Sequence, residues 1–293
     1  MRRSKLLFVA LTGACAAVVT NWALTQLVLV ACATPGSPHE GMKLIFEDDF
    51  DGTTLDLRKW YAGGKPSSVH PTGEHWSDSH FVSADEAQFA ETYRVRDGIL
   101  TMRATYNPDY RDPQNWGRKW FGAEISSALP NGTAQGSFRK GYTEVRMKVP
   151  AGKGSWPAFW MLEVASIDKS KRLDGVVEIN VMEHYGFLHN FNPGIHNWEP
   201  NGRDSIRNGI GNISVKSNIT TDFHTYGCLI NNDEVVYFFD GSEIFRKPLP
   251  RAASVSPFFL LLDMAVGGGY EVEVPPSGYY ETQVDYAKIW SNG

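Results

Sequence analysis

Short apolar runs separated by turn-forming residues make up most of the chain after residue 40. Residues 143–149 alternate polar and apolar side chains, which is typical of an antiparallel strand with one buried face. Helical periodicity is scarce in this part of the chain. Further strands are expected over 44–46, 93–95, 99–104, 176–182, 224–230, 235–239 and 284–290. The pattern predicts a single all-β domain over residues 42–293, either a sandwich or a jelly roll.

Asp-Gly pairs separate several of these expected strands. They occur at Asp97-Gly98, Asp174-Gly175 and Asp240-Gly241. Both central residues of a tight type I′ turn need a positive φ, which Asp tolerates and Gly adopts freely. The three pairs therefore predict β-hairpins.

The first 33 residues have a different pattern. Arg2, Arg3 and Lys5 precede a long apolar stretch that ends in small residues, which predicts an export signal over residues 1–33. The final Ala-Cys-Ala fits ordinary signal peptidase, whereas the overlapping Leu-Val-Ala-Cys resembles a lipobox that would lipidate Cys32. An uncleaved membrane anchor is a third interpretation. We expect a secreted or periplasmic protein, or a lipoprotein anchored through Cys32, with a linker over residues 34–41.

Composition narrows the classes of partner. Apolar residues make up 42% of the chain and charged residues 21%, which is typical of a globular protein. The 28 Lys and Arg residues against 33 Asp and Glu residues give a net charge of −5, which disfavours a nucleic-acid partner. Aromatic residues make up 13%, a content that suits both cores and sugar-stacking surfaces. Only Cys228 of the three cysteines falls in the expected domain, so no internal disulfide framework is expected. We also expect a monomer.

Two glutamates lie close together within the expected strand near residue 180. On a regular strand Glu178 and Asn180 share one face, whereas Glu183 points to the other face. One extra residue between Asn180 and Glu183, a β-bulge, would bring both carboxylates to the same face. A retaining glycosidase needs such a pair, as nucleophile and acid/base. The alternative is that both are surface-facing strand acids.

The segment Glu-Ile-Asn-Val-Met-Glu at 178–183 resembles the Glu-x-Asp-x-x-Glu signature of glycoside hydrolase family 16, the laminarinase, agarase and carrageenase group. The resemblance covers nearly all of residues 42–291 and includes a Trp-Pro-Ala-Phe-Trp segment within 152–162. Other segments similar to the family, in the same order, are 44–56 with Lys59-Trp60, 223–226, 237–241, 264–269 and 284–286.

This resemblance implies a curved β-jelly-roll sandwich with a substrate cleft on its concave face. It also implies that Glu178 is the nucleophile and Glu183 the general acid/base of a retaining mechanism, with no cofactor for catalysis. Asn180 departs from the family, which usually has Asp there. An amide can donate a hydrogen bond to Glu178 but carries no charge, and losing a nearby negative charge lowers the pKa of the acid. A slower enzyme, a more acidic pH optimum and a sugar-binding relative without turnover are the alternatives.

Further residues match family positions near the cleft. Trp156 and Trp160, four apart on one strand, would face the same groove and stack on sugar rings, unless they are core residues. His184 follows the acid/base and could orient it, or it is an ordinary strand histidine. His196 matches a cleft histidine, and Glu86 falls where the family has a segment at the cleft edge.

Many relatives bind a structural Ca²⁺ on the convex face. They use a carboxylate from the last strand and backbone oxygens. Asp285 matches that carboxylate, and Gly98 and Glu47 are expected as its companions, because Ca²⁺ prefers oxygen ligands. The alternative is that these are plain surface residues.

The sequence thus predicts an exported, endo-acting β-glycanase whose partner is a polysaccharide, with β-1,3- or mixed-linked glucan as the leading substrate. The alternatives are a galactan- or exopolysaccharide-active enzyme, a transglycosylase, and a carbohydrate-binding relative with weak or lost turnover.

Overall fold

The computed structural model describes residues 37–64, 76–167, 175–206, 211–250 and 256–292. The chain divides into two units at Glu40/Gly41. Of the first unit, the described residues form a turn in which the backbone N–H of Glu40 donates to the Ser37 carbonyl at 2.8 Å. The predicted export signal lies outside the described residues. Over the ranges that are described, no helix combines the length and apolar character needed to cross a membrane.

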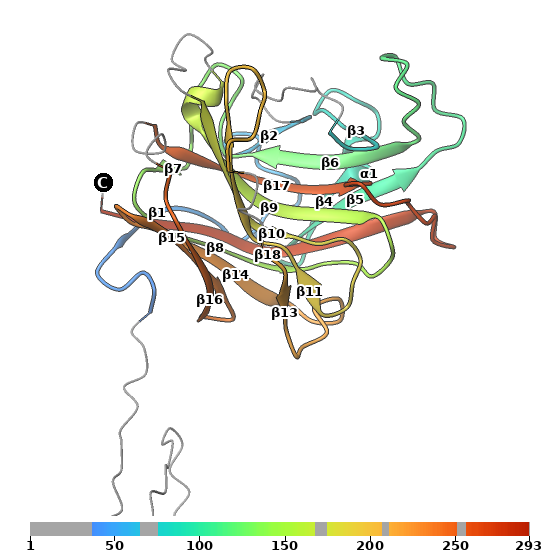
Figure 1. Ribbon diagram of the computed structural model, residues 1–293. Coiled ribbons are helices and arrows are strands. Elements are labelled where there is room, and N and C mark those ends of the chain that lie inside the picture. Colours follow the sequence, from blue (N-terminus) through green and yellow to red (C-terminus); the bar gives the residue numbers. More distant parts are fainter. Residues whose placement is uncertain (1–36, 65–75, 168–174, 207–210, 251–255, 293) are drawn as a thin grey trace, which may run out of the picture. The chain divides into compact units, whose positions relative to one another are not determined.

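The Gly41–Gly293 unit is built almost entirely from antiparallel strands, which confirms the predicted all-β class (Figure 1). The helical elements described are α1 (Phe89–Thr92) and a 3₁₀ turn (Val164–Ser166). The strands are β1 (Lys43–Asp48), β2 (Tyr61–Ala62), β3 (Ser79–Phe81), β4 (Tyr93–Arg96), β5 (Ile99–Tyr106), β6 (Trp120–Ser126), β7 (Ser137–Phe138), β8 (Gly141–Lys148), β9 (Ser155–Glu163), β10 (Val176–Glu183), β11 (Asn190–Phe191), β12 (Gly194–Trp198), β13 (Ile213–Ser214), β14 (His224–Ile230), β15 (Glu234–Phe239), β16 (Ser242–Pro248), β17 (Phe258–Val266) and β18 (Tyr279–Ser291).

The strands form two layers that are joined at one edge. One layer has the order β12-β10-β9-β17-β6, and the other has the order β5-β18-β8-β14-β15-β16. The two meet where β6 pairs with β5, so the sheet curves back over itself (Figure 1). Alternate side chains of β9, such as Phe159 and Met161, are fully buried in the core between the layers. Their neighbours on the other face are free to form a site.

The β-bulge predicted in β10 is present. Asn180 lies opposite Trp160 of β9, but Met182 lies opposite Phe159, so Val181 is the extra residue. The bulge turns Glu183 to the same face as Asn180, because Glu183 then pairs with Ala158. The sequence expectation about the two glutamates is therefore confirmed at the level of the backbone.

Two of the three predicted Asp-Gly hairpins are confirmed. Asp97 (φ 53°) and Gly98 (φ 74°) connect β4 to β5, and Asp240 (φ 46°) and Gly241 (φ 74°) connect β15 to β16. Positive φ at both positions is the signature of a type I′ turn. Asp174 of the third pair lies outside the described residues.

Candidate active site

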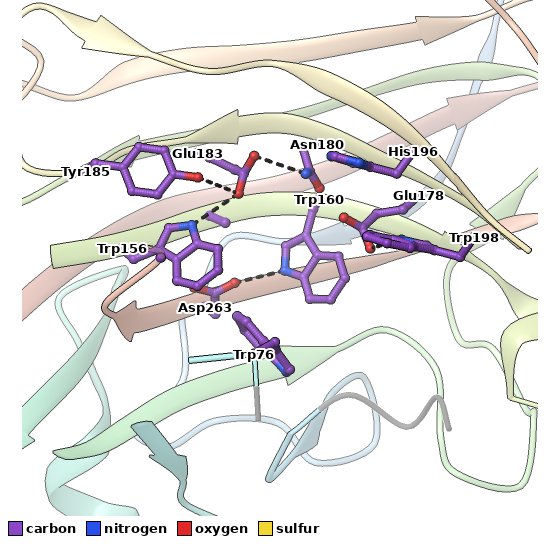
Figure 2. Close-up of a pocket in the computed structure, with 12 residues that line it drawn as sticks. Trp76, Trp156, Trp160, Glu178, Asn180, Glu183, Tyr185, His196, Trp198 and Asp263 are labelled. Carbon is purple, nitrogen blue, oxygen red and sulfur yellow. Dashed lines mark hydrogen bonds between the residues drawn. The ribbon is translucent and has the colours of Figure 1, made fainter. Parts of the chain in front are cut away.

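A cavity of about 320 Å³ opens on the outer face of the layer that contains β12, β10, β9 and β17 (Figure 2). Its lining is dominated by aromatic and acidic side chains, which come from all four strands and from neighbouring loops. The lining residues are Trp76, Trp156, Ala158, Trp160, Glu178, Asn180, Glu183, Tyr185, His196, Trp198, Asp263 and Gly268.

Strand register explains why these residues meet. Residues that pair across antiparallel strands point to the same face of a sheet. Glu183 of β10 pairs with Ala158 of β9, which pairs with Asp263 of β17, so that the two acids lie in one row. The neighbouring row runs from Asn180 to Trp160. The small side chain at position 158 leaves room between the two acids.

Glu183 lies in a buried, hydrogen-bonded position. Its side chain is held by three donors: Oε1 accepts from Trp156 Nε1 at 3.1 Å and from the Tyr185 hydroxyl at 3.0 Å, and Oε2 accepts from Asn180 Nδ2 at 3.0 Å (Figure 2). Burial raises the pKa of Glu183, and the negative charge of Glu178 raises it further, against the opposing effects of the positive charge of His196 and of the hydrogen-bond donors. A carboxyl group with a raised pKa is suited to act as a general acid.

Glu178 is more open to solvent than Glu183 and lies near the other end of β10. Its Oε2 accepts a hydrogen bond from Trp198 Nε1 at 3.0 Å. His196 lies directly opposite Glu178 on β12. A half-buried carboxylate beside a donor and an imidazole, with its second oxygen available to the cavity, is suited to act as a nucleophile.

Aromatic rings form one wall of the cavity. Trp76 stacks on Phe81 at 4.9 Å and meets Trp156 edge-on at 5.3 Å and Trp160 at 6.0 Å. The indole of Trp160 is fixed because its Nε1 donates to Asp263 Oδ2 at 2.9 Å. Burial raises the pKa of Asp263 well above its ordinary value. Such rings can cover the apolar face of a pyranose.

The structure brings together most of the residues predicted for the site, namely Glu178, Asn180, Glu183, Trp156, Trp160 and His196. Asn180 differs from expectation in its partner. Its amide was expected to donate to Glu178, but it donates to Glu183, because the bulge places Glu183 next to it on the same face.

Two predicted substrate-binding residues lie outside the cavity lining. His184 is fully buried, and its ring nitrogens face the backbone carbonyls of Asn190 (3.2 Å) and Pro150 (3.0 Å). His184 therefore contacts the backbone on both sides of its ring and does not line the cavity. Glu86 contacts His80 Nε2 at 2.8 Å and accepts from the backbone N–H of Ser83 at 2.8 Å, which makes it a loop-fastening residue.

The side chains of two of the three residues expected to bind Ca²⁺ lie next to basic groups. Asp285 is ion-paired with Arg146, and Glu47 lies 3.9 Å from Lys288 Nζ. Gly98 is part of the β4–β5 turn. Within the described ranges, no group of three or more His, Cys, Asp or Glu side chains could hold a metal ion. A structural Ca²⁺ held by the Asp285 carboxylate and by backbone oxygens stays a prediction.

Several lining residues were not predicted from the sequence. Trp198 and Tyr185 each lie two residues from a predicted site residue, and a period of two along a strand could have identified Trp198. Asp263 is an acid within the apolar strand β17, which is itself a signal, since a buried carboxylate is costly without a role. For Trp76 the sequence holds no local signal.

The chain was compared with known proteins. The model of the family described as "Glycosyl hydrolases family 16" matches residues 78–266. The chain is 29% identical to glucan endo-1,3-beta-glucosidase A1 of Niallia circulans, over 89% of the chain and 40% of that protein. It is 30% identical to a beta-glucanase of Rhodothermus marinus, over 90% of the chain and 91% of that protein.

Solved structures agree with these matches. The laminarinase from Rhodothermus marinus superposes with a TM-score of 0.66 at 25% identity, covering 85% of this chain and 97% of that one. The laminarinase from Flavobacterium sp. UMI-01 has the same fold, with a TM-score of 0.65 at 24% identity, and covers 85% of this chain and 100% of that one. The predicted jelly roll is confirmed, and the chain belongs to glycosyl hydrolases family 16.

Proposed function

We propose that the protein is an endo-acting β-glucanase that hydrolyses β-1,3- or mixed-linked glucan with retention of configuration at the anomeric carbon. The observation that carries the proposal is the bulge at Val181, which puts Glu178 and Glu183 on one face of β10 within an aromatic cavity. The two carboxyl groups have different surroundings. Glu183 is buried with a raised pKa, whereas Glu178 is half-buried beside His196.

The proposed reaction has two displacements. In the first, Glu178 attacks the anomeric carbon while Glu183 donates its proton to the glycosidic oxygen, so the leaving chain departs as an alcohol. In the second, Glu183 takes a proton from water, the resulting hydroxide attacks the glycosyl-enzyme ester, and Glu178 is released as a carboxylate. Trp156, Tyr185 and Asn180 hold the carboxyl group of Glu183 in place through both steps.

The relatives support glucan as the substrate class, because those named above are a glucan endo-1,3-beta-glucosidase and a beta-glucanase. A more distant relative is a keratan-sulfate endo-1,4-beta-galactosidase from Sphingobacterium multivorum, 27% identical over 53% of the chain and 37% of that protein. A galactan is therefore the alternative substrate.

Asn180 favours a second candidate function, a carbohydrate-binding relative with weak or lost turnover. An amide cannot supply the negative charge that helps to keep the acid protonated. However, both glutamates of the proposed catalytic pair are retained, and Glu183 keeps a raised pKa through burial. These observations favour the enzyme.

Export is part of the proposal. Arg2, Arg3 and Lys5 before a long apolar stretch support it, as does the substrate, because a polysaccharide is met outside the cytoplasm. Cell fractionation of the full chain and of the Cys32→Ser variant distinguishes ordinary signal-peptide cleavage from lipidation of Cys32. Loss of membrane attachment in the variant would favour the lipoprotein, and release of both forms would favour ordinary cleavage.

The function is tested by measuring reducing ends released from β-1,3-glucan, mixed-linked β-glucan, agarose and carrageenan, with Glu178→Gln as the matched control. The expected result is rapid release of a ladder of oligosaccharides from a β-glucan and none by the control. Retarded migration in gels containing the glucan, without any release, would instead establish the binding function.

A further inference from the structure

Asp204 lies outside the lining of the cavity but contacts the nucleophile side of the site through His196. His196 faces Glu178 across the β10–β12 pair, so both side chains are on the cavity face. Its Nδ1 lies 2.9 Å from Asp204 Oδ2. Trp198, two residues along β12, stacks flat on the imidazole at 5.3 Å with an interplanar angle of 8°, and its own Nε1 donates to Glu178 Oε2.

The carboxylate of Asp204 is itself fixed. Its Oδ1 accepts hydrogen bonds from the backbone N–H groups of Asn197 at 3.1 Å and Ile206 at 3.0 Å. A β-bridge to Trp198 holds the backbone of Asp204 beside β12. Since these contacts leave Oδ2 to face His196, the loop after β12 presents an oriented carboxylate to the ring. The side chains of His196 and Asp204 are only 13% and 15% exposed.

We propose that Asp204 is a positioning residue that fixes the orientation of His196 and holds it as an imidazolium ion beside Glu178, the proposed nucleophile. The proposal rests on the function assigned to Glu178 above. Nδ1 of His196 carries the proton that is donated to Asp204, and Nε2 carries the second proton. The side-chain amide of Asn180 donates to Glu183, whereas His196 of β12 lies opposite Glu178.

The charges around the imidazole agree with this role. Burial of His196 disfavours its charged form, but the carboxylates of Glu178, Asp204 and Glu183 outweigh burial and raise the pKa of the ring. Glu178 and Glu183 act from β10, and Asp204 acts from the loop that follows β12. Burial also opposes ionisation of Asp204, but hydrogen bonds from Ile206 and His196 lower its pKa overall.

The test uses Asp204→Asn in the full chain. The amide keeps the shape and the oxygen that accepts from the backbone, but it removes the charge facing the ring. In ¹⁵N-histidine-labelled protein, the NMR titration midpoint of His196 is expected to fall by about one unit or more. The first chemical step is followed with an aryl β-glucoside whose leaving group needs no proton from Glu183. At pH values above the native His196 midpoint its rate is expected to fall about tenfold, because there a shift of one pKa unit changes the charged fraction about tenfold.

Asp240 offers a matched control, because it forms the same kind of pair outside the cavity. Its Oδ2 lies 2.7 Å from His224 Nδ1, and its Oδ1 accepts from the Thr225 backbone N–H at 2.9 Å. Asp240→Asn should leave both the His196 midpoint and the first step unchanged.

An unchanged titration midpoint of His196 in Asp204→Asn would overturn the proposal. A lowered midpoint would also overturn it if the rate of the first chemical step stayed within twofold of the native rate. The NMR titration needs no turnover, so its result does not depend on whether the proposed function is correct. In Glu178→Gln the His196 midpoint must also fall, and a midpoint that does not move would contradict the electrostatic link. A native protein that cleaves no glycan contradicts the proposed function alone.

Discussion

The side-chain amide of Asn180 donates a hydrogen bond to Oε2 of Glu183 at 3.0 Å, across the bulge at Val181. This contact favours the ionised form of Glu183, because an amide N–H stabilises a carboxylate. A carboxylate at position 180 would instead favour the protonated form of Glu183. A carboxylate can only accept a hydrogen bond, so Glu183 would have to carry the proton and donate it. The identity of residue 180 therefore bears on the proton of the acid and not on the nucleophile.

Asn180→Asp is expected to move the alkaline limb of the pH profile of kcat/KM upward by about one unit, because a negative charge next to Glu183 raises its pKa. Turnover at neutral pH should equal or exceed that of the native protein. Asn231→Asp is the control, since it adds the same charge in the β14–β15 turn, where Asn231 Oδ1 accepts from two backbone N–H groups. An alkaline limb that stays in place would show that residue 180 does not act on the acid.

Tyr185→Phe removes one of the three donors to Glu183 while keeping the ring. The pKa of Glu183 should rise further, and kcat should fall a few-fold because the carboxyl group is held less firmly. Tyr270→Phe is the matched change, since its ring packs against Tyr185 at 5.0 Å. Equal pH profiles for the two variants would contradict a role for the Tyr185 hydroxyl.

Glu178→Gln and Glu183→Gln should each reduce glucan hydrolysis by at least about a thousandfold, because nucleophile and acid/base act as one unit. The two should differ on an aryl β-glucoside with a good leaving group. Glu183→Gln should still release a burst of the phenol, since that departure needs no proton, whereas Glu178→Gln should release none. Stopped-flow absorbance measures the burst. A burst from Glu178→Gln would reverse the assignment.

Sequence patterns predicted the strands, two of the hairpins and the bulge because each depends on local chemistry. Asp97-Gly98 and Asp240-Gly241 adopt the positive φ that a tight turn between two strands needs, and the spacing of Glu178 and Glu183 by itself requires an extra residue if they are to share a face. Trp76 and Asp263 reach the cavity from distant parts of the chain, and only the pairing of β17 with β9 places Asp263 there.

Glu86 and His184 were predicted to bind substrate but do not line the cavity. Both are near the site in sequence or by family position, but hydrogen bonds that the sequence does not reveal turn them elsewhere. The partner of Asn180 was likewise a matter of side-chain direction, which strand periodicity cannot resolve once a bulge intervenes.

Glu163, at the end of β9, gives a prediction about stability. Burial raises its pKa to about 7, despite a hydrogen bond that its Oε2 accepts from the Val177 backbone N–H at 2.8 Å. The folded state therefore binds a proton that the unfolded state releases between about pH 4.5 and pH 7. This contribution to the free energy of unfolding is fully present below the unfolded pKa and is lost as pH rises through the folded pKa, by about 3 kcal/mol in total.

Glu163→Gln should be as stable as the native protein near pH 4 and more stable near pH 8, because Gln mimics the protonated acid. Urea unfolding at both pH values gives the comparison. Glu271→Gln, at a side chain that is 85% exposed, is the control and should run parallel to the native protein. A Glu163→Gln protein that lost stability equally at both pH values would indicate a packing defect.

In the proposed reaction Glu178 forms a covalent bond to the sugar. Incubation of the protein with a 2-deoxy-2-fluoro β-glucoside that carries a good leaving group should trap this bond, because the fluorine slows release of the glycosyl-enzyme ester. Mass spectrometry should find one sugar per protein, and peptide mapping should place it on Glu178. A label on Glu183, or hydrolysis with no covalent species and with inverted product, would contradict the claim.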